Sequence, residues 1–133
     1  MSLTDHGWDA DHAAALPPGL DPGRVIRQAR DLSTLVTAAG EVEAEVSGRF
    51  RHHAAGPAAF PAVGDWVAFR LVDGGRAVIE AVLPRRGAFT RKAAGVTAEA
   101  QVVAANVDVV LLVSGLDGDF NLRRLERYVT TAW

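Results

Sequence analysis

Four cations stand within nine consecutive residues of this 133-residue sequence. Residues 84–92, PRRGAFTRK, contain Arg85, Arg86, Arg91 and Lys92, no acidic residue, and the ring of Phe89 between the two basic pairs. Guanidinium and ammonium groups suit phosphate oxygens, and an aromatic ring can stack on a nucleic-acid base. The run therefore predicts an RNA-binding loop. From composition alone, a solvated loop or one that contacts an acidic neighbouring domain is an equally good interpretation.

Two further arginines could extend this basic patch. Arg49 and Arg51 follow a predicted strand and would join residues 85–92 if the fold brings the two segments together. The RNA-binding candidates are therefore Arg85, Arg86, Phe89, Arg91, Lys92, Arg49 and Arg51.

Other kinds of site have little support. The chain contains no cysteine, which excludes disulfides, thiolate metal sites and cysteine nucleophiles. Its four histidines lie in an acidic start or in a loop, with no serine placed for a nucleophile triad. No G-x-x-x-x-G-K-[ST] phosphate loop occurs. We predict no catalytic, metal-binding or nucleotide-binding residue in this chain.

The net charge of −2 hides an uneven distribution. Residues 1–23 hold four aspartates and no Lys or Arg, so the rest of the chain is mildly basic. We predict that residues 1–23 form a flexible acidic tail. No apolar run approaches the roughly 20 residues that span a bilayer, and the start lacks the pattern of a secretory signal. We therefore expect a soluble, cytoplasmic, monomeric protein.

The middle of the chain has the pattern of short β-strands. Residues 41–47, EVEAEVS, alternate polar and apolar side chains as a half-buried strand does. Runs of strand length also occur at 24–30, 35–37, 66–71 and 77–83, with a hairpin turn predicted at Asp73-Gly74-Gly75 and a loop at 51–63. About five short strands at this spacing favour a small barrel or sandwich.

The last third changes character. Residues 107–113, VDVVLLV, form the nearly continuous apolar run typical of a parallel strand covered on both faces. A helix is predicted to follow, capped at Asp119 or Asn121. A strand followed by a helix is half of a βαβ unit, and about 27 residues cannot supply its neighbours. We interpret residues 107–133 as the opening of an α/β domain whose remainder is missing.

Four segments in order carry a resemblance to a known family. These are VGDWV at 63–67, LPRRGAFTR at 83–91, QVVAANVD at 101–108 and DFNLRRLERY at 119–128. Together they resemble the ribosome small-subunit-dependent GTPase A family, of RsgA/YjeQ type. The resemblance implies an OB-fold barrel of five strands at 24–92, with the basic loop at its end. It also implies that a linker and the first strand and helix of a circularly permuted GTPase domain occupy 93–133.

The resemblance also implies a function. Members bind the small ribosomal subunit and its rRNA and hydrolyse GTP late in its maturation, with magnesium and zinc as further cofactors. The guanine-reading, phosphate-loop, magnesium and zinc motifs are absent from this sequence. We therefore expect a truncated chain that docks on the subunit, needs no cofactor of its own and is inactive as a GTPase when alone. The alternative is an OB-fold module that packs on a GTPase domain without binding RNA directly.

Overall fold

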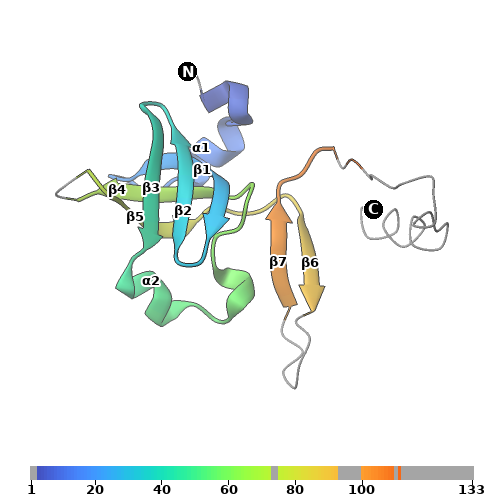
Figure 1. Cartoon of the computed structure of the whole chain (residues 1–133). Coiled ribbons are helices and arrows are strands. Elements are labelled where there is room, and N and C mark those ends of the chain that lie inside the picture. The colour runs from blue at the N-terminus through green and yellow to red at the C-terminus, as the bar shows by residue number, and fades with distance from the viewer. Residues whose placement is uncertain (1–2, 73–74, 93–99, 110, 112–133) are drawn as a thin grey trace.

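Five strands close into a barrel in the computed structural model, which describes residues 3–72, 75–92, 100–109 and 111 (Figure 1). The barrel strands are β1 (Asp21–Ala29), β2 (Leu32–Thr37), β3 (Gly40–Val46), β4 (Trp66–Leu71) and β5 (Ala77–Val82). Their order is β1-β2-β3-β5-β4, and β4 pairs with β1 to close the barrel. Only β3 and β5 run parallel among the barrel pairs of the described chain. This is the OB-fold, and the predicted five-stranded barrel is confirmed.

The barrel core follows from alternation along the strands. In β3 the even-numbered residues Val42, Ala44 and Val46 face inward, while the three glutamates of the strand are exposed to solvent, as the sequence predicted. The fully buried side chains at the centre include Leu35 and Ile79. Because every strand pairs on both sides, the described barrel leaves no long open edge.

A short helix lies in the connection between β3 and β4, part of which was predicted to be a loop. Helix α2 (Gly48–His53) is followed by a single 3-10 turn, η2 (Pro57–Ala59). Ser47 caps α2, since its hydroxyl accepts a hydrogen bond of 2.9 Å from the backbone N–H of Phe50. The loop prediction for 51–63 was wrong at Arg51–His53 because a helix of six residues is too short to show a periodic apolar stripe.

The N-terminal segment packs on the barrel, whereas the sequence suggested a flexible tail over 1–23. A 3-10 turn η1 (Leu3–His6) and helix α1 (Ala10–Ala15) precede β1. Trp8 contacts the buried Trp66 with ring centroids 4.8 Å apart, and the side chain of His12 is buried beside both indoles. Leu3, Leu16 and Leu20 complete this second apolar cluster. In Figure 1 α1 lies above the barrel and α2 below it.

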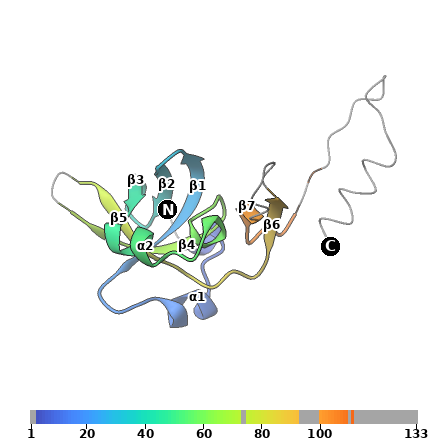
Figure 2. The same cartoon turned by 90° about the horizontal axis from the view of Figure 1, so that it is seen from below.

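A two-stranded sheet lies beside the barrel in both views (Figures 1 and 2). It pairs β6 (Ala88–Lys92) with β7 (Ala100–Ala105) in antiparallel fashion. The predicted basic loop at 85–92 is therefore a strand over its last five residues. This strand could not be predicted from local pattern, because its partner strand begins eight residues further along.

The predicted strand at 107–113 and its helix fall largely outside the described residues. Val107, Asp108, Val109 and Leu111 are described and belong to no strand. In the described part of the chain, no helix is long and apolar enough to cross a membrane.

Candidate nucleic-acid interface

Arg85, a predicted phosphate ligand, points into the protein. Its Nε and Nη2 donate to the two carboxylate oxygens of Asp65 at 2.8 Å each. Nη1 and Nη2 also donate to the backbone carbonyls of Ala58 and Phe60, at 2.7 and 3.0 Å. The Asp65 side chain is fully buried and the Arg85 side chain is only 20% exposed. The guanidinium therefore has little left to offer a ligand and instead ties the start of the basic run to the barrel.

Arg86 is exposed but has an acidic partner in the N-terminal segment. Its guanidinium contacts the carboxylate of Asp9, and the Arg86 side chain is 55% exposed to solvent. Its backbone N–H donates to the side-chain oxygen of Asn106 at 2.8 Å. Exposed ion pairs of this kind contribute little to stability, so a phosphate could displace Asp9 at small cost.

The remaining residues of the basic run lie on β6. The side chain of Phe89 is half-buried there. Arg91 and Lys92 belong to the same strand, but their side chains fall outside what the structure describes.

Three of the four sequence segments that carry the family resemblance meet at one junction. The backbone carbonyl of Gly64 accepts hydrogen bonds from the Asn106 amide and from Nε of Arg24, both of 3.0 Å. Nη2 of Arg24 also donates to the Asn106 carbonyl at 3.0 Å. Residues 64–65, 85–87 and 105–106 thus hold β6 and β7 against the barrel. Sequence reasoning assigned only RNA contacts to this region and missed the junction, because its partners are far apart along the chain.

Arg49 and Arg51 lie on α2, on the other side of the barrel from α1, and α2 lies apart from β6 in both views (Figures 1 and 2). Both arginine side chains are exposed. They therefore belong to a surface of their own, centred on α2, which we call the α2 surface and define by Arg49, Arg51 and the two hollows beside them.

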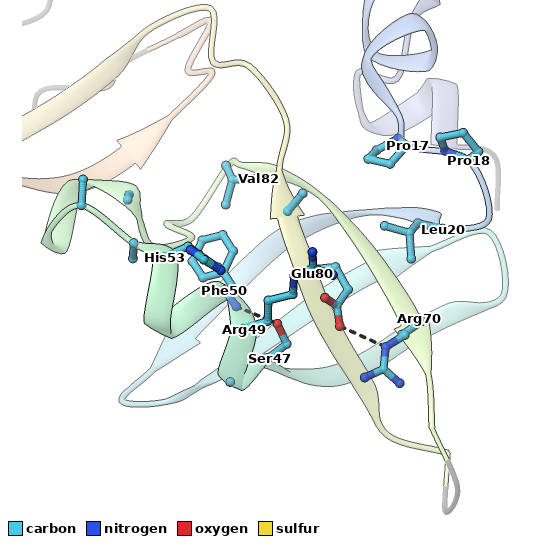
Figure 3. A pocket seen from close by; sticks show the side chains of 15 residues that line it. Pro17, Pro18, Leu20, Ser47, Arg49, Phe50, His53, Arg70, Glu80 and Val82 are labelled. Atoms are coloured by element: carbon cyan, nitrogen blue, oxygen red, sulfur yellow. Dashed lines mark hydrogen bonds and ion pairs between the residues drawn. The ribbon is translucent and has the colours of Figure 1, made fainter.

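The larger hollow has a volume of about 1030 Å³ and lies between α2, β5 and the segment that leads into β1 (Figure 3). Arg49, Phe50 and His53 line it from α2, and Pro17, Pro18 and Leu20 line it from the N-terminal segment. At its other end Nε of Arg70 donates to Glu80 at 3.0 Å. Its lining is partly apolar. Glu80 pairs with Arg70 and not with Arg49, so the charge of Arg49 is not neutralised by Glu80.

The smaller hollow, about 430 Å³, lies between the β1–β2 turn and α2. Arg51 projects over the ring of Phe60, with its guanidinium carbon 5.7 Å from the ring centroid. Arg30, in the turn, is exposed and lies in the left-handed region with a φ of 49°. Sequence reasoning missed both Arg30 and Phe60. Arg30 was predicted to end a strand, and Phe60 was predicted to lie in a loop.

Comparison with known proteins identifies the family. No protein-family model matches the chain. A small ribosomal subunit biogenesis GTPase RsgA from Opitutus terrae is 48% identical over 145 residues, which cover 99% of this chain and 40% of that protein. An RsgA 2 from Lactiplantibacillus plantarum is 45% identical over 111 residues, covering 84% of this chain and 31% of that protein. Over the region that it spans, the chain belongs to the RsgA family.

Two solved structures share the fold of this RsgA-family chain. YjeQ from Thermotoga maritima aligns with a TM-score of 0.59 and 24% identity, over 85% of this chain and 37% of that one. YloQ, described as a circularly permuted GTPase, aligns with a TM-score of 0.55 and 17% identity, over 92% of this chain and 38% of that one. The chain thus spans about 30 to 40% of the length of the relatives and structures that it matches.

Proposed function

We propose that this chain is the subunit-docking part of a GTPase that binds the small ribosomal subunit during its late maturation. The relatives are named for biogenesis of that subunit, and the barrel is a fold that often binds oligonucleotides. Residues 24–92 act as the docking domain in this proposal, and 93–133 lead into the GTPase domain. In this proposal the protein is a monomer and binds the small ribosomal subunit in the cytoplasm.

The observation that carries the proposal is the α2 surface. Two exposed arginines stand two residues apart on one short helix, and each borders a hollow that could receive part of an RNA chain. Arg86 and the β6 residues Phe89, Arg91 and Lys92 provide a second set of contacts. Arg85 supports this second set indirectly, because its bonds to Asp65 position the residues that follow it.

GTP hydrolysis is assigned to the whole protein. Phosphoryl transfer needs a phosphate cradle, a magnesium site and a positioned water. The sequence holds no phosphate-loop pattern, and no group of three metal-ligating side chains gathers among the described residues. In this proposal GTP, magnesium and zinc are bound by other parts of the protein.

Co-sedimentation of the purified chain with small ribosomal subunits tests the docking role. Arg49→Ala/Arg51→Ala should weaken binding, and Arg86→Ala/Arg91→Ala/Lys92→Ala should weaken it further when combined. Large subunits serve as the control for non-specific attraction. Binding that is unchanged in both variants would remove the RNA-docking role. GTP turnover by this chain alone would overturn the assignment of catalysis to other segments.

A second function, in protein contact, is favoured by a different observation. Several large apolar side chains are exposed on the barrel and the neighbouring sheet, with Ile26 and Val63 each 38% exposed and Val103 54% exposed. Exposed apolar side chains of this size suit an OB-fold module that packs on a GTPase domain without touching RNA. Partner binding that resists nuclease and does not change with salt would favour this function over RNA docking.

A further inference from the structure

We propose that the smaller hollow, between the β1–β2 turn and α2, binds one unpaired nucleotide of single-stranded RNA. The base would stack on the guanidinium of Arg51, and the flanking phosphate would meet Arg30. This inference rests on the proposed RNA-docking function and assigns a particular ligand to one part of the α2 surface.

The stacking platform is built from three side chains in contact. The guanidinium of Arg51 lies over the ring of Phe60, with 5.7 Å between its central carbon and the ring centroid. Phe60 is held from the side by Phe50, in an edge-to-face contact with centroids 5.7 Å apart. The Arg51 side chain is nevertheless 54% exposed, so it has surface left to offer a ligand. Unstacked RNA bases bind to guanidinium planes and aromatic rings in this way.

The rest of the hollow suits a nucleotide in size and polarity. Its volume of about 430 Å³ falls in the range of small-molecule sites, and Pro57 and Pro61 form apolar walls. Gln28 lies at its edge, where its side-chain oxygen accepts a hydrogen bond of 2.5 Å from Ser33 and its amide donates to the Arg30 carbonyl. The Gln28 amide keeps one N–H for a base edge.

The positive charge around the hollow attracts an anion. The stacking platform then favours a nucleotide over an acidic protein segment, because such a segment has no base to stack on Arg51. Arg30 and Arg51 line it from two elements. Asp31 is the acid of the lining, and its carboxylate is 3.8 Å from Arg51 and 81% exposed, so it neutralises little. A base within a duplex is already stacked on its neighbours and cannot enter such a hollow. An unpaired base can.

Fluorescence anisotropy with a labelled oligouridine of eight nucleotides tests the site. Arg51→Lys keeps the charge but removes the flat guanidinium, so a stacking site predicts that it weakens binding about as much as Arg51→Ala, roughly tenfold. Arg27→Lys is the matched control, because Arg27 is an exposed arginine of β1 that borders neither hollow. This variant should bind nearly as well as the unsubstituted chain.

Three outcomes separate this inference from the proposed function. If Arg51→Lys binds like the unsubstituted chain, Arg51 acts only as a charge, and the nucleotide site is wrong while RNA docking stands. If an RNA duplex of the same length binds as tightly as the single strand, the site is also wrong. If the unsubstituted chain binds neither RNA nor small subunits, the proposed function and this inference fail together.

Phe60→Leu, with folding checked by circular dichroism, gives an independent reading and should also weaken binding of the oligouridine.

Discussion

The guanidinium of Arg85 grips the carboxylate of Asp65 through two hydrogen bonds of 2.8 Å each. Asp65 is fully buried and also accepts the backbone N–H of Ala62 at 2.8 Å. A bidentate pair of this kind has both geometric precision and charge assistance. It joins the entry into β4 to the segment that leads from the barrel into β6, so a cation of the basic run is part of the fold itself.

Asp65→Ala should destabilise the chain strongly. It leaves the Arg85 guanidinium with only two backbone carbonyls, and breaking one side of a buried pair costs about 3–5 kcal/mol. Urea unfolding measures this. Arg70→Ala, which removes a pair whose arginine is 52% exposed, should cost about 1 kcal/mol or less. The double variant Asp65→Ala/Arg85→Ala should cost less than the sum of the single variants, and strictly additive effects would contradict a coupled pair.

Gly64→Ala should loosen the contact between the barrel and β7. Gly64 has a φ of +95°, and an added Cβ would lie 1.9 Å from the carbonyl oxygen of Ala105. Gly40→Ala is a matched control, because Gly40 also has a positive φ, of +116°, but open space around its Cβ position. The backbone strain is common to both variants, so the overlap should make Gly64→Ala about 1–3 kcal/mol worse.

Hydrogen exchange locates the effect of Gly64→Ala. The amide of Ala105 donates to the Val63 carbonyl at 2.8 Å, and this amide should lose protection in Gly64→Ala but not in Gly40→Ala. Equal loss of stability and protection in the two variants would show that no clash occurs at Ala105.

The barrel could be predicted from the sequence because its information is local. Alternation such as that of Glu41–Val46, together with the Asp73-Gly75 turn, indicates strands and hairpins one at a time. The roles of Arg85 and Asn106 could not be predicted in this way, because each depends on a partner twenty or more residues distant. The same holds for Phe60, because its contact with Arg51 forms only when α2 places that guanidinium over the ring.

The packing of the N-terminal segment should depend on pH through His12. Burial between the indoles of Trp8 and Trp66, and then the charge of Arg24, lower the pKa of His12 from its ordinary value of 6.5, while Asp11 acts in the opposite direction. The unfolded chain therefore binds a proton more readily than the folded chain does. Stability from this group is fully present above pH 6.5 and falls as the pH drops below 6.5 toward the lowered pKa.

Tryptophan fluorescence in a Trp133→Phe background follows this titration, because the two remaining indoles flank His12. Urea unfolding is measured at about pH 7.5, 6.5 and 5.5, values that bracket the ordinary histidine pKa. The urea concentration at the midpoint of unfolding should fall as the pH is lowered. His12→Phe keeps an aromatic ring in the cluster but cannot titrate, so its midpoint should change less. Parallel decreases in the two proteins would mean that other groups control the response.

Binding of single-stranded RNA should depend on salt through Arg49 and Arg30, the arginines of the two hollows that are expected to contact phosphates. Each phosphate contact releases condensed counterions, so log affinity falls as log salt rises. Removing one such arginine should make this negative slope shallower by about 0.7. Arg27→Ala is the control, because Arg27 is an exposed arginine of β1 that borders neither hollow. Anisotropy titrations between 50 and 200 mM salt, the range over which such slopes are large, give the measurement. If Arg27→Ala lowers the slope as much as Arg49→Ala, the attraction comes from overall charge and not from the α2 surface.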